Sequence, residues 1–171
     1  MFKIGKGLST IGYIMLAFLQ LIAINFMRNN GLGSIFSLQI LAFSGLIFIC
    51  GGFSAMYIDN HNSMDLGILL LMGISLILEI LTNFLHVYPP EIIYIMVDVA
   101  IYLLIIVNLI QDMSITKMIL VVMVVSAMCF RIFGRNILDM VSEGNYIYVR
   151  IGYIICNIIC AIYCATKVQK Y

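Results

Sequence analysis

Six long apolar runs, separated by short polar segments, follow one another along the chain. They cover residues 4–27, 34–58, 66–87, 91–111, 115–133 and 146–166. An α-helix rises about 1.5 Å per residue, so roughly 20 residues are needed to cross a hydrocarbon core of about 30 Å. Every run is close to this length or longer. The pattern therefore predicts an all-α protein: a polytopic transmembrane helical bundle of six membrane-spanning helices, in a single integral membrane domain that covers residues 1–171.

A shorter segment between the fifth and sixth runs has a different pattern. Over about residues 134–145, apolar side chains such as Ile137 fall on one helical face, whereas Arg135 and Asp139 fall on another. This distribution is typical of a short amphipathic helix that lies in the headgroup region of a bilayer. We therefore expect an interfacial helix here, with a partner-docking surface as the alternative.

Composition narrows the class of protein. Of the 171 residues, 64% are hydrophobic and 10% are charged, whereas soluble domains carry about 25% charged residues. No soluble domain fits between the apolar runs, so the lipid bilayer is the expected partner and any function lies in or at the membrane. The net charge of +1 and the lack of a basic run give no indication of nucleic-acid binding.

Two consecutive prolines, Pro89 and Pro90, separate the third apolar run from the fourth. Proline lacks an amide hydrogen, and the residue before a proline is disfavoured in the helical region, so we expect the third helix to end near residue 87 or 88. Glu79 lies ten residues before the first proline, and Asp98 lies eight residues after the second. Both acids are therefore expected roughly 12–15 Å from the turn, near the middle of the bilayer.

Other polar residues share a helical face with each of these acids. The candidate ligand-binding or cation-binding residues are Glu79, Asn83, His86, Tyr94, Asp98 and Asn108. An ionisable group at this depth is costly unless it faces protein or water, and we expect no Lys or Arg at the same depth. A proton, a metal cation or a cationic ligand would reduce the cost of two neighbouring carboxylates. Alternatively, both acids are protonated and hydrogen-bond to neighbours such as Asn83 or Tyr102.

Polar and small residues also form stripes on other helices. Tyr13 and Gln20 share a stripe of the first helix, and Asn157 lies on a polar stripe of the sixth, so we expect these faces to point inward. On the second helix, small residues recur at steps of seven, seven and four. They are Ser37, Ser44, Gly51 and Ala55. Small side chains let helix backbones approach closely in lipid, and this face is therefore expected to pack against another helix.

The sequence contains no clear cofactor or metal motif. The five cysteines form no CxxC pair, and Cys156, Cys160 and Cys164 recur every four residues, as expected of small apolar side chains on one packed helix face. The polar loop 59–65 contains three possible metal ligands, but three ligands in one loop are more typical of an ordinary solvated loop. We therefore assign no cofactor and leave a metal undefined.

Three classes of function fit a small protein of this kind. The first is a transport or solute/cation-binding membrane subunit with an intramembrane acidic site, which acts as a homo-oligomer or within a larger membrane complex. The alternative is a non-catalytic membrane partner, such as a sensor domain, an assembly factor or an immunity-type protein, whose buried acids are structural. An enzyme is not favoured and no catalytic residue is assigned, because no HExxH, Gly-x-Gly-Asp or Tyr-Asp motif occurs.

The distribution of basic residues bears on orientation. Six crossings put both termini on one side of the membrane, and that side carries five lysines, against four arginines on the other. Four of these lysines lie close to the ends of the chain. We therefore expect an integral protein of the bacterial cytoplasmic (inner) membrane with both termini in the cytoplasm.

Overall fold

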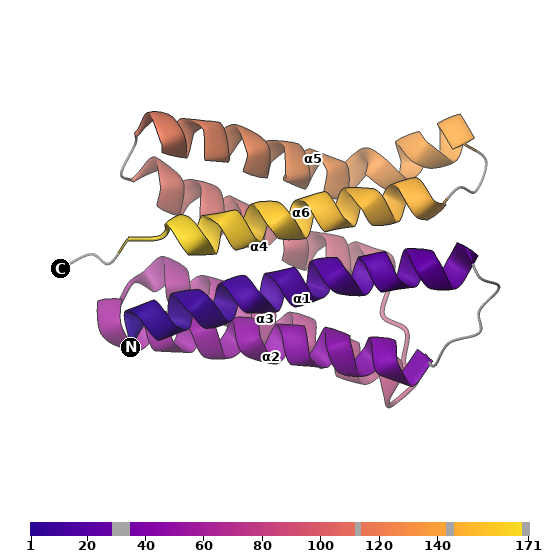
Figure 1. The fold of residues 1–171 in the computed structure, drawn as a ribbon, viewed down its shortest axis with the longest axis horizontal. Coiled ribbons are helices and arrows are strands. Elements are labelled where there is room, and N and C mark those ends of the chain that lie inside the picture. The colour runs from indigo at the N-terminus through magenta and orange to yellow at the C-terminus, as the bar shows by residue number, and fades with distance from the viewer. Residues whose placement is uncertain (29–34, 112–113, 143–145, 169–171) are drawn as a thin grey trace.

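The computed structural model describes residues 1–28, 35–111, 114–142 and 146–168, and the side chains among them except those of residues 27–28, 35–37, 135–142 and 146. These residues form α-helices and contain no strand (Figure 1). The helices are α1 (Phe2–Arg28), α2 (Ile35–Asn60), α3 (Ser63–Asn83), α4 (Glu91–Ile110), α5 (Ile115–Ser142) and α6 (Tyr146–Thr166). All six are long and apolar enough to cross a membrane. The predicted all-α class and the six apolar helices are confirmed.

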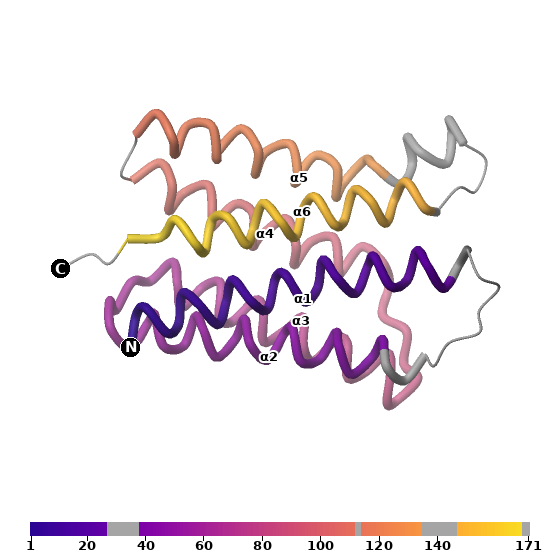
Figure 2. The backbone as a smooth tube through the Cα atoms, in the orientation of Figure 1, coloured from indigo at the N-terminus to yellow at the C-terminus, as the bar shows by residue number. Residues whose placement is uncertain are grey.

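The helices pack as a closed ring. Each contacts its neighbours in sequence, and α6 packs against α1 to complete the circle. The chain runs back and forth, so that both termini lie at the same end of the bundle (Figure 2). There the Lys6 ammonium group donates a hydrogen bond to the carbonyl oxygen of Lys167 (3.1 Å). The termini therefore lie at one end of the bundle, and the α3–α4 connection lies at the opposite end.

The connection between α3 and α4 begins earlier than the prolines alone predict. α3 ends at Asn83 and α4 begins at Glu91. His86 has a φ of 51°, and the amide of Val87 donates a hydrogen bond to the carbonyl oxygen of Leu81 (2.9 Å). A residue with left-handed backbone angles commonly ends an α-helix. The chain therefore leaves the helix before it reaches the residues next to Pro89.

Glycines bring α1 and α2 into close contact. A Cβ atom added at Gly12 would lie 2.6 Å from the carbonyl oxygen of Gly45, and one added at Gly52 would lie 2.1 Å from Ser9 Oγ and 2.5 Å from the carbonyl oxygen of Gly5. Real side chains do not tolerate such distances from backbone atoms. The two backbones can approach this closely only because these positions have no side chain.

The packing face predicted for α2 is partly wrong. Gly51 is exposed, and a Cβ added there would meet nothing within 4 Å, whereas the adjacent Gly52 is buried against α1. Ala55 does belong to the contact, because its Cβ lies 3.0 Å from the position of a Cβ added at Gly5. The side chain of Ser37 lies outside the described part of the chain. Neighbouring positions on a helix point about 100° apart, so an error of one residue moves a glycine off the interface.

The separate interfacial helix expected at 134–145 is not supported. α5 continues without a break from Ile115 to Ser142, and residues 143–145 lie outside the described residues. The apolar part of α5, long enough to cross a membrane, ends at Gly134. The segment that we expected to begin a new helix is thus the C-terminal extension of the fifth helix.

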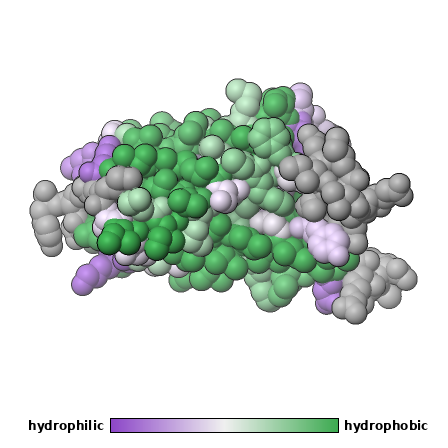
Figure 3. Space-filling model, turned by 90° about the horizontal axis from the view of Figure 1, so that it is seen from above, coloured by the Kyte–Doolittle hydropathy of each residue, from purple (hydrophilic) through white to green (hydrophobic). Residues whose placement is uncertain are grey.

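On the face shown in Figure 3, the described surface is mainly apolar over the middle of the bundle, and hydrophilic residues lie toward its ends. Large aliphatic side chains such as Leu70, Ile77 and Val122 are 57–65% exposed. A protein that folds in water rarely exposes so continuous an apolar surface. Together with the six apolar helices, this surface is compatible with a multi-pass membrane protein.

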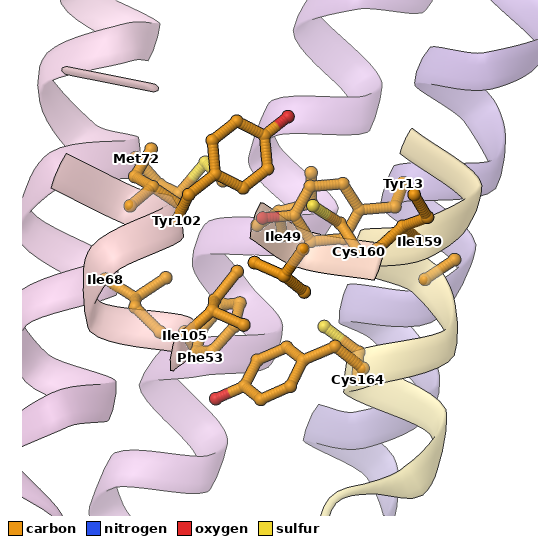
Figure 4. Close-up of a cluster of buried hydrophobic side chains, with 14 of the residues drawn as sticks. Tyr13, Ile49, Phe53, Ile68, Met72, Tyr102, Ile105, Ile159, Cys160 and Cys164 are labelled. Atoms are coloured by element: carbon orange, nitrogen blue, oxygen red, sulfur yellow. The ribbon is translucent and has the colours of Figure 1, made fainter. Parts of the chain in front are cut away.

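Buried apolar side chains fill the part of the ring nearer the termini. Ile49, Phe53, Ile68, Ile105 and Cys164 all have less than 2% of their surface exposed, and they come from four different helices (Figure 4). The packing inside this part of the bundle is dense enough to leave these side chains no solvent contact. The core closes the ring at this end, and the opposite half contains the cavity described next.

Candidate functional site

A cavity of about 240 Å³ lies inside the ring, lined by residues of all six helices. On α3 it extends from Met72 to Glu79 and on α4 from Tyr94 to Tyr102, so it occupies the middle of the bundle and the half toward the α3–α4 connection. Its polar lining includes Gln20, Ser75, Glu79, Asp98, Arg131 and Asn157, with four tyrosines, Tyr13, Tyr94, Tyr102 and Tyr153. Cavities that are mainly apolar with a few placed polar groups are typical ligand sites.

Glu79 and Asp98 line this same cavity from adjacent helices. Two amides in series, one on α3 and one on α2, hold Glu79: Asn83 Nδ2 donates to Glu79 Oε2 (2.6 Å), and Gln39 Nε2 donates to Asn83 Oδ1 (3.2 Å). Among the described residues, no Lys, Arg or His forms an ion pair with Glu79. An amide donor orients a carboxylate but does not neutralise its charge, so Glu79 brings an uncompensated acid to the cavity wall.

Asp98, by contrast, has a basic partner. Arg131 of α5 forms an ion pair with it through Nε and Oδ2. The other side of the guanidinium group is held by Tyr153, whose hydroxyl accepts a hydrogen bond from Arg131 Nη1 (2.6 Å) and whose ring lies 4.9 Å below the guanidinium carbon. Arg131 is thus fixed by a charge, a hydrogen bond and a cation–π contact.

The prediction that no basic residue lies at the depth of the acids is wrong. It assumed that the fifth helix ends near residue 133, which would have allowed Arg131 to reach the membrane surface. The apolar part of α5 does end close to there, at Gly134, but Arg131 does not extend toward that end. Its side chain turns inward to Asp98 instead.

Tyrosines form much of the remaining wall. Tyr94 shares a hydrogen bond with Thr82 Oγ1 (2.5 Å). Tyr13 is only 3% exposed, and its hydroxyl has no hydrogen-bond partner among the described residues. Its side chain reaches from α1 into the interior of the bundle, toward Tyr102 (Figure 4). A buried hydroxyl without a partner is costly, and in a cavity wall it indicates a place where a ligand or water can bind.

The six candidate residues do not form one site. Glu79, Asp98 and Tyr94 line the cavity, and Asn83 supports it through Glu79. His86 is exposed in the connection outside the helices. Asn108 lies at the other end of α4, where its side chain donates to the Tyr163 hydroxyl (2.6 Å) and lines a second cavity of about 30 Å³. A shared helical face does not imply a shared site, because α4 is long enough to pass both cavities.

Several cavity residues were not among these candidates. Tyr13, Gln20 and Asn157 belong to the polar stripes of the first and sixth helices, and that signal is sufficient to place them inside the ring. Tyr153 lies four residues before Asn157, on the same polar stripe of the sixth helix. Arg131 has no such signal in the sequence alone, and its inclusion depends on the contact of α5 with α4 and α6, which only the folded ring provides.

The end of the bundle near the termini holds its own charged groups. Asp65 is fully buried in the first turn of α3 and forms an ion pair with Lys167, whose side chain is also buried. The N-terminal ammonium group pairs with Asp59 (3.0 Å), and His61 is exposed. The described residues contain no cluster of three His, Cys, Asp or Glu side chains suited to a metal ion. The expectation of a solvated loop at 59–65 is therefore wrong for Asp65.

Breaking the Asp98–Arg131 pair is expected to destabilise the protein. Arg131→Met leaves a carboxylate in the cavity wall without its counter-charge, and Asp98→Asn leaves the guanidinium group without one. We expect each variant to lose about 1–3 kcal/mol of unfolding free energy, below the range for fully buried pairs because both side chains are partly accessible. The measurement is SDS titration in mixed micelles. Losses that simply add in the double variant would contradict the coupling.

Comparison with protein-family models, with curated proteins and with solved structures finds no match to this chain. A fold does not by itself define a function, so the functional argument depends on the chemistry of the cavity: one acid without a basic partner, one fixed ion pair and a wall rich in tyrosine.

Proposed function

We propose that the protein is a transport or solute/cation-binding membrane subunit, and that its ligand occupies the cavity inside the six-helix ring. The observation that carries this proposal is the uncompensated carboxylate of Glu79 in the wall of an internal cavity. Ionisable groups inside a membrane-spanning bundle are expensive and commonly mark solute or ion pathways. Tyr13, Gln20 and Asn157 add polar groups with which a small solute can hydrogen-bond.

The position of the cavity favours capture from one side. It lies toward the α3–α4 connection, whereas the half near the termini is filled by buried side chains such as Phe53 and Ile105. Release to the other side requires the core to rearrange, and a single ring of six helices offers no second moving part. We therefore propose that the protein acts as a homo-oligomer or within a larger membrane complex.

The proposed location is the bacterial cytoplasmic membrane with both termini in the cytoplasm. Lys3, Lys6, Lys117 and Lys167 lie at the end of the bundle that carries the termini. Basic residues are enriched on the cytoplasmic side of membrane proteins. In this orientation the cavity lies toward the outer face of the membrane, which suits the capture of an external solute.

The alternative is a non-catalytic membrane partner whose acids are structural. The Asp98–Arg131 ion pair and the Gln39–Asn83–Glu79 relay favour it, because both join helices within the bundle. Hydrogen bonds between helices stabilise membrane bundles without any ligand. Under this hypothesis Glu79 is protonated and serves only to connect α3 to α2.

Ligand-dependent stability separates the two functions. A ligand that binds only the folded protein at 100 times its Kd adds about 2.7 kcal/mol of stability, which corresponds to a rise in Tm of about 5 °C or more. We expect some small solutes to raise the Tm of the wild type in detergent and Glu79→Gln to remove that rise. The matched control is Glu91→Gln, at an exposed acid on the next helix, which should keep it.

The opposite result supports the structural alternative. In that case no solute raises the Tm of the wild type, and Glu79→Gln is as stable as the wild type or more stable. The carboxamide preserves the shape of the side chain and can still hydrogen-bond to Asn83, so a purely structural acid tolerates the change.

A further inference from the structure

The charges in the cavity wall do not balance. The acidic and basic residues among its lining side chains are two carboxylates and one guanidinium group, those of Glu79, Asp98 and Arg131. Asp98 and Arg131 form an ion pair and offset each other. The carboxylate of Glu79 has only the neutral amide of Asn83 as a partner among the described residues. An ionised Glu79 therefore leaves one negative charge in the cavity, and a ligand with one positive charge would compensate it.

An anionic solute meets no uncompensated positive charge among the described residues of this cavity. Nε of Arg131 is bound to Asp98, Nη1 donates to Tyr153, and one face of the guanidinium group covers the Tyr153 ring. Arg150 does not line the cavity, and its Nη1 donates to Gln20 (2.7 Å). Both guanidinium groups thus already have partners, and Asp98 offsets the positive charge of Arg131.

The side chains that line the cavity favour an organic cation over a bare metal ion. The lining combines one carboxylate with four tyrosines and many aliphatic side chains, and the described residues contain no cluster of carboxylate, imidazole and thiolate ligands for a metal. Aromatic rings attract ammonium groups through their faces. A volume of about 240 Å³ equals roughly eight water molecules at about 30 Å³ each, so it suits a ligand with roughly that number of non-hydrogen atoms.

The buried hydroxyl of Tyr13 supplies the second observation. It is 3% exposed, lines the cavity and has no partner among the described residues. A hydroxyl can accept a hydrogen bond from an ammonium group as readily as it donates one. A primary ammonium ligand has three donors, enough to bind Glu79 and to reach a second acceptor such as this one.

We infer that the ligand of this cavity is a small organic monocation, an ammonium compound with an apolar or aromatic portion, whose charge is bound by Glu79 and whose apolar part contacts the tyrosines. The inference rests on the proposed function, because it names the class of solute that the cavity binds. It predicts that charge, more than size or polarity, decides which solutes bind.

The test uses ligand-size probes that differ in charge. The purified protein in detergent is titrated calorimetrically with 2-phenylethylammonium and butylammonium as cations, 2-phenylethanol as the matched neutral compound, and phenylacetate as the anion. We expect the cations to bind at least ten-fold more tightly than the neutral and anionic compounds. Glu79→Gln should remove this preference, and Glu91→Gln should leave it unchanged.

Two further variants protect the test against a folding defect. Glu79→Asp keeps the charge on a shorter side chain and should retain the preference for cations even if affinity falls. Tyr13→Phe removes one hydroxyl and keeps the ring, and it should weaken binding of the primary ammonium probes several-fold without changing the charge preference. If Glu79→Gln does not fold, these two variants still test the inference, because a lost cation preference in Glu79→Asp or an unchanged ammonium affinity in Tyr13→Phe would contradict it.

The outcomes distinguish the inference from the proposed function. Preferential binding of the neutral or anionic compound overturns the inference and leaves a solute-binding protein. Cation binding that survives Glu79→Gln also overturns it, because the charge is then bound elsewhere. If none of the probes binds and Glu79→Gln keeps full stability, both the inference and the proposed function are wrong.

Discussion

Replacing Lys167 with Met is expected to lower the free energy of unfolding by about 3–5 kcal/mol, the range measured when one partner of a buried ion pair is removed. Asp65 is fully buried, and only 7% of the Lys167 side chain is exposed. The ammonium group also lies 5.3 Å from the centre of the Phe53 ring and 5.6 Å from that of Tyr163. The variant keeps the apolar length of the side chain but leaves the Asp65 carboxylate buried without a counter-charge.

The double variant Asp65→Asn/Lys167→Met tests the cause of this loss. Without the acid no charge remains uncompensated, so most of the stability should return. Lys3→Met, at an exposed lysine of α1, is the matched control and should change the stability by less than about 0.5 kcal/mol. SDS titration in mixed micelles measures all four proteins. A loss in the double variant as large as in Lys167→Met would show that the ion pair is not the reason.

Adding one methyl group at Gly52 is expected to cost about 2–3 kcal/mol, whereas the same change at Gly51 should not destabilise the protein. The Cβ of Gly52→Ala would lie 2.1 Å from Ser9 Oγ, 2.5 Å from the carbonyl oxygen of Gly5 and 2.6 Å from the amide nitrogen of Ser9. Two of these three atoms belong to the backbone, so α1 and α2 have to move apart along their tightest contact.

Gly51→Ala is the matched control for this prediction. It introduces the same residue in the same helix one position earlier, where a Cβ meets nothing within 4 Å. Alanine favours the helix over glycine by up to about 1 kcal/mol, so this variant should be as stable as the wild type or slightly more stable. Equal losses of Tm in the two variants would contradict the proposed role of the α1–α2 contact, because only Gly52 lies in that contact.

The helical faces in the sequence predict only some of the residues that line the cavity. The spacing of Glu79 and Asp98 about the two prolines predicts their similar depth, and both acids do line one cavity. His86 and Asn108 follow the same helical faces but lie elsewhere. A helical face specifies the direction of a side chain and says nothing about what is packed opposite it. That information comes from the other helices of the ring.

The sequence by itself determined the number of apolar helices and the all-α class, because the length and hydropathy of each run are local properties that no other part of the chain can change. It also determined where α4 begins, because Pro90 allows no helix to continue through it. Only the tertiary structure decided the partner of Asp98, which depends on the packing of α5 against α4. It likewise decided which of two adjacent glycines meets α1, since helix rotation is set by the packing of the closed ring.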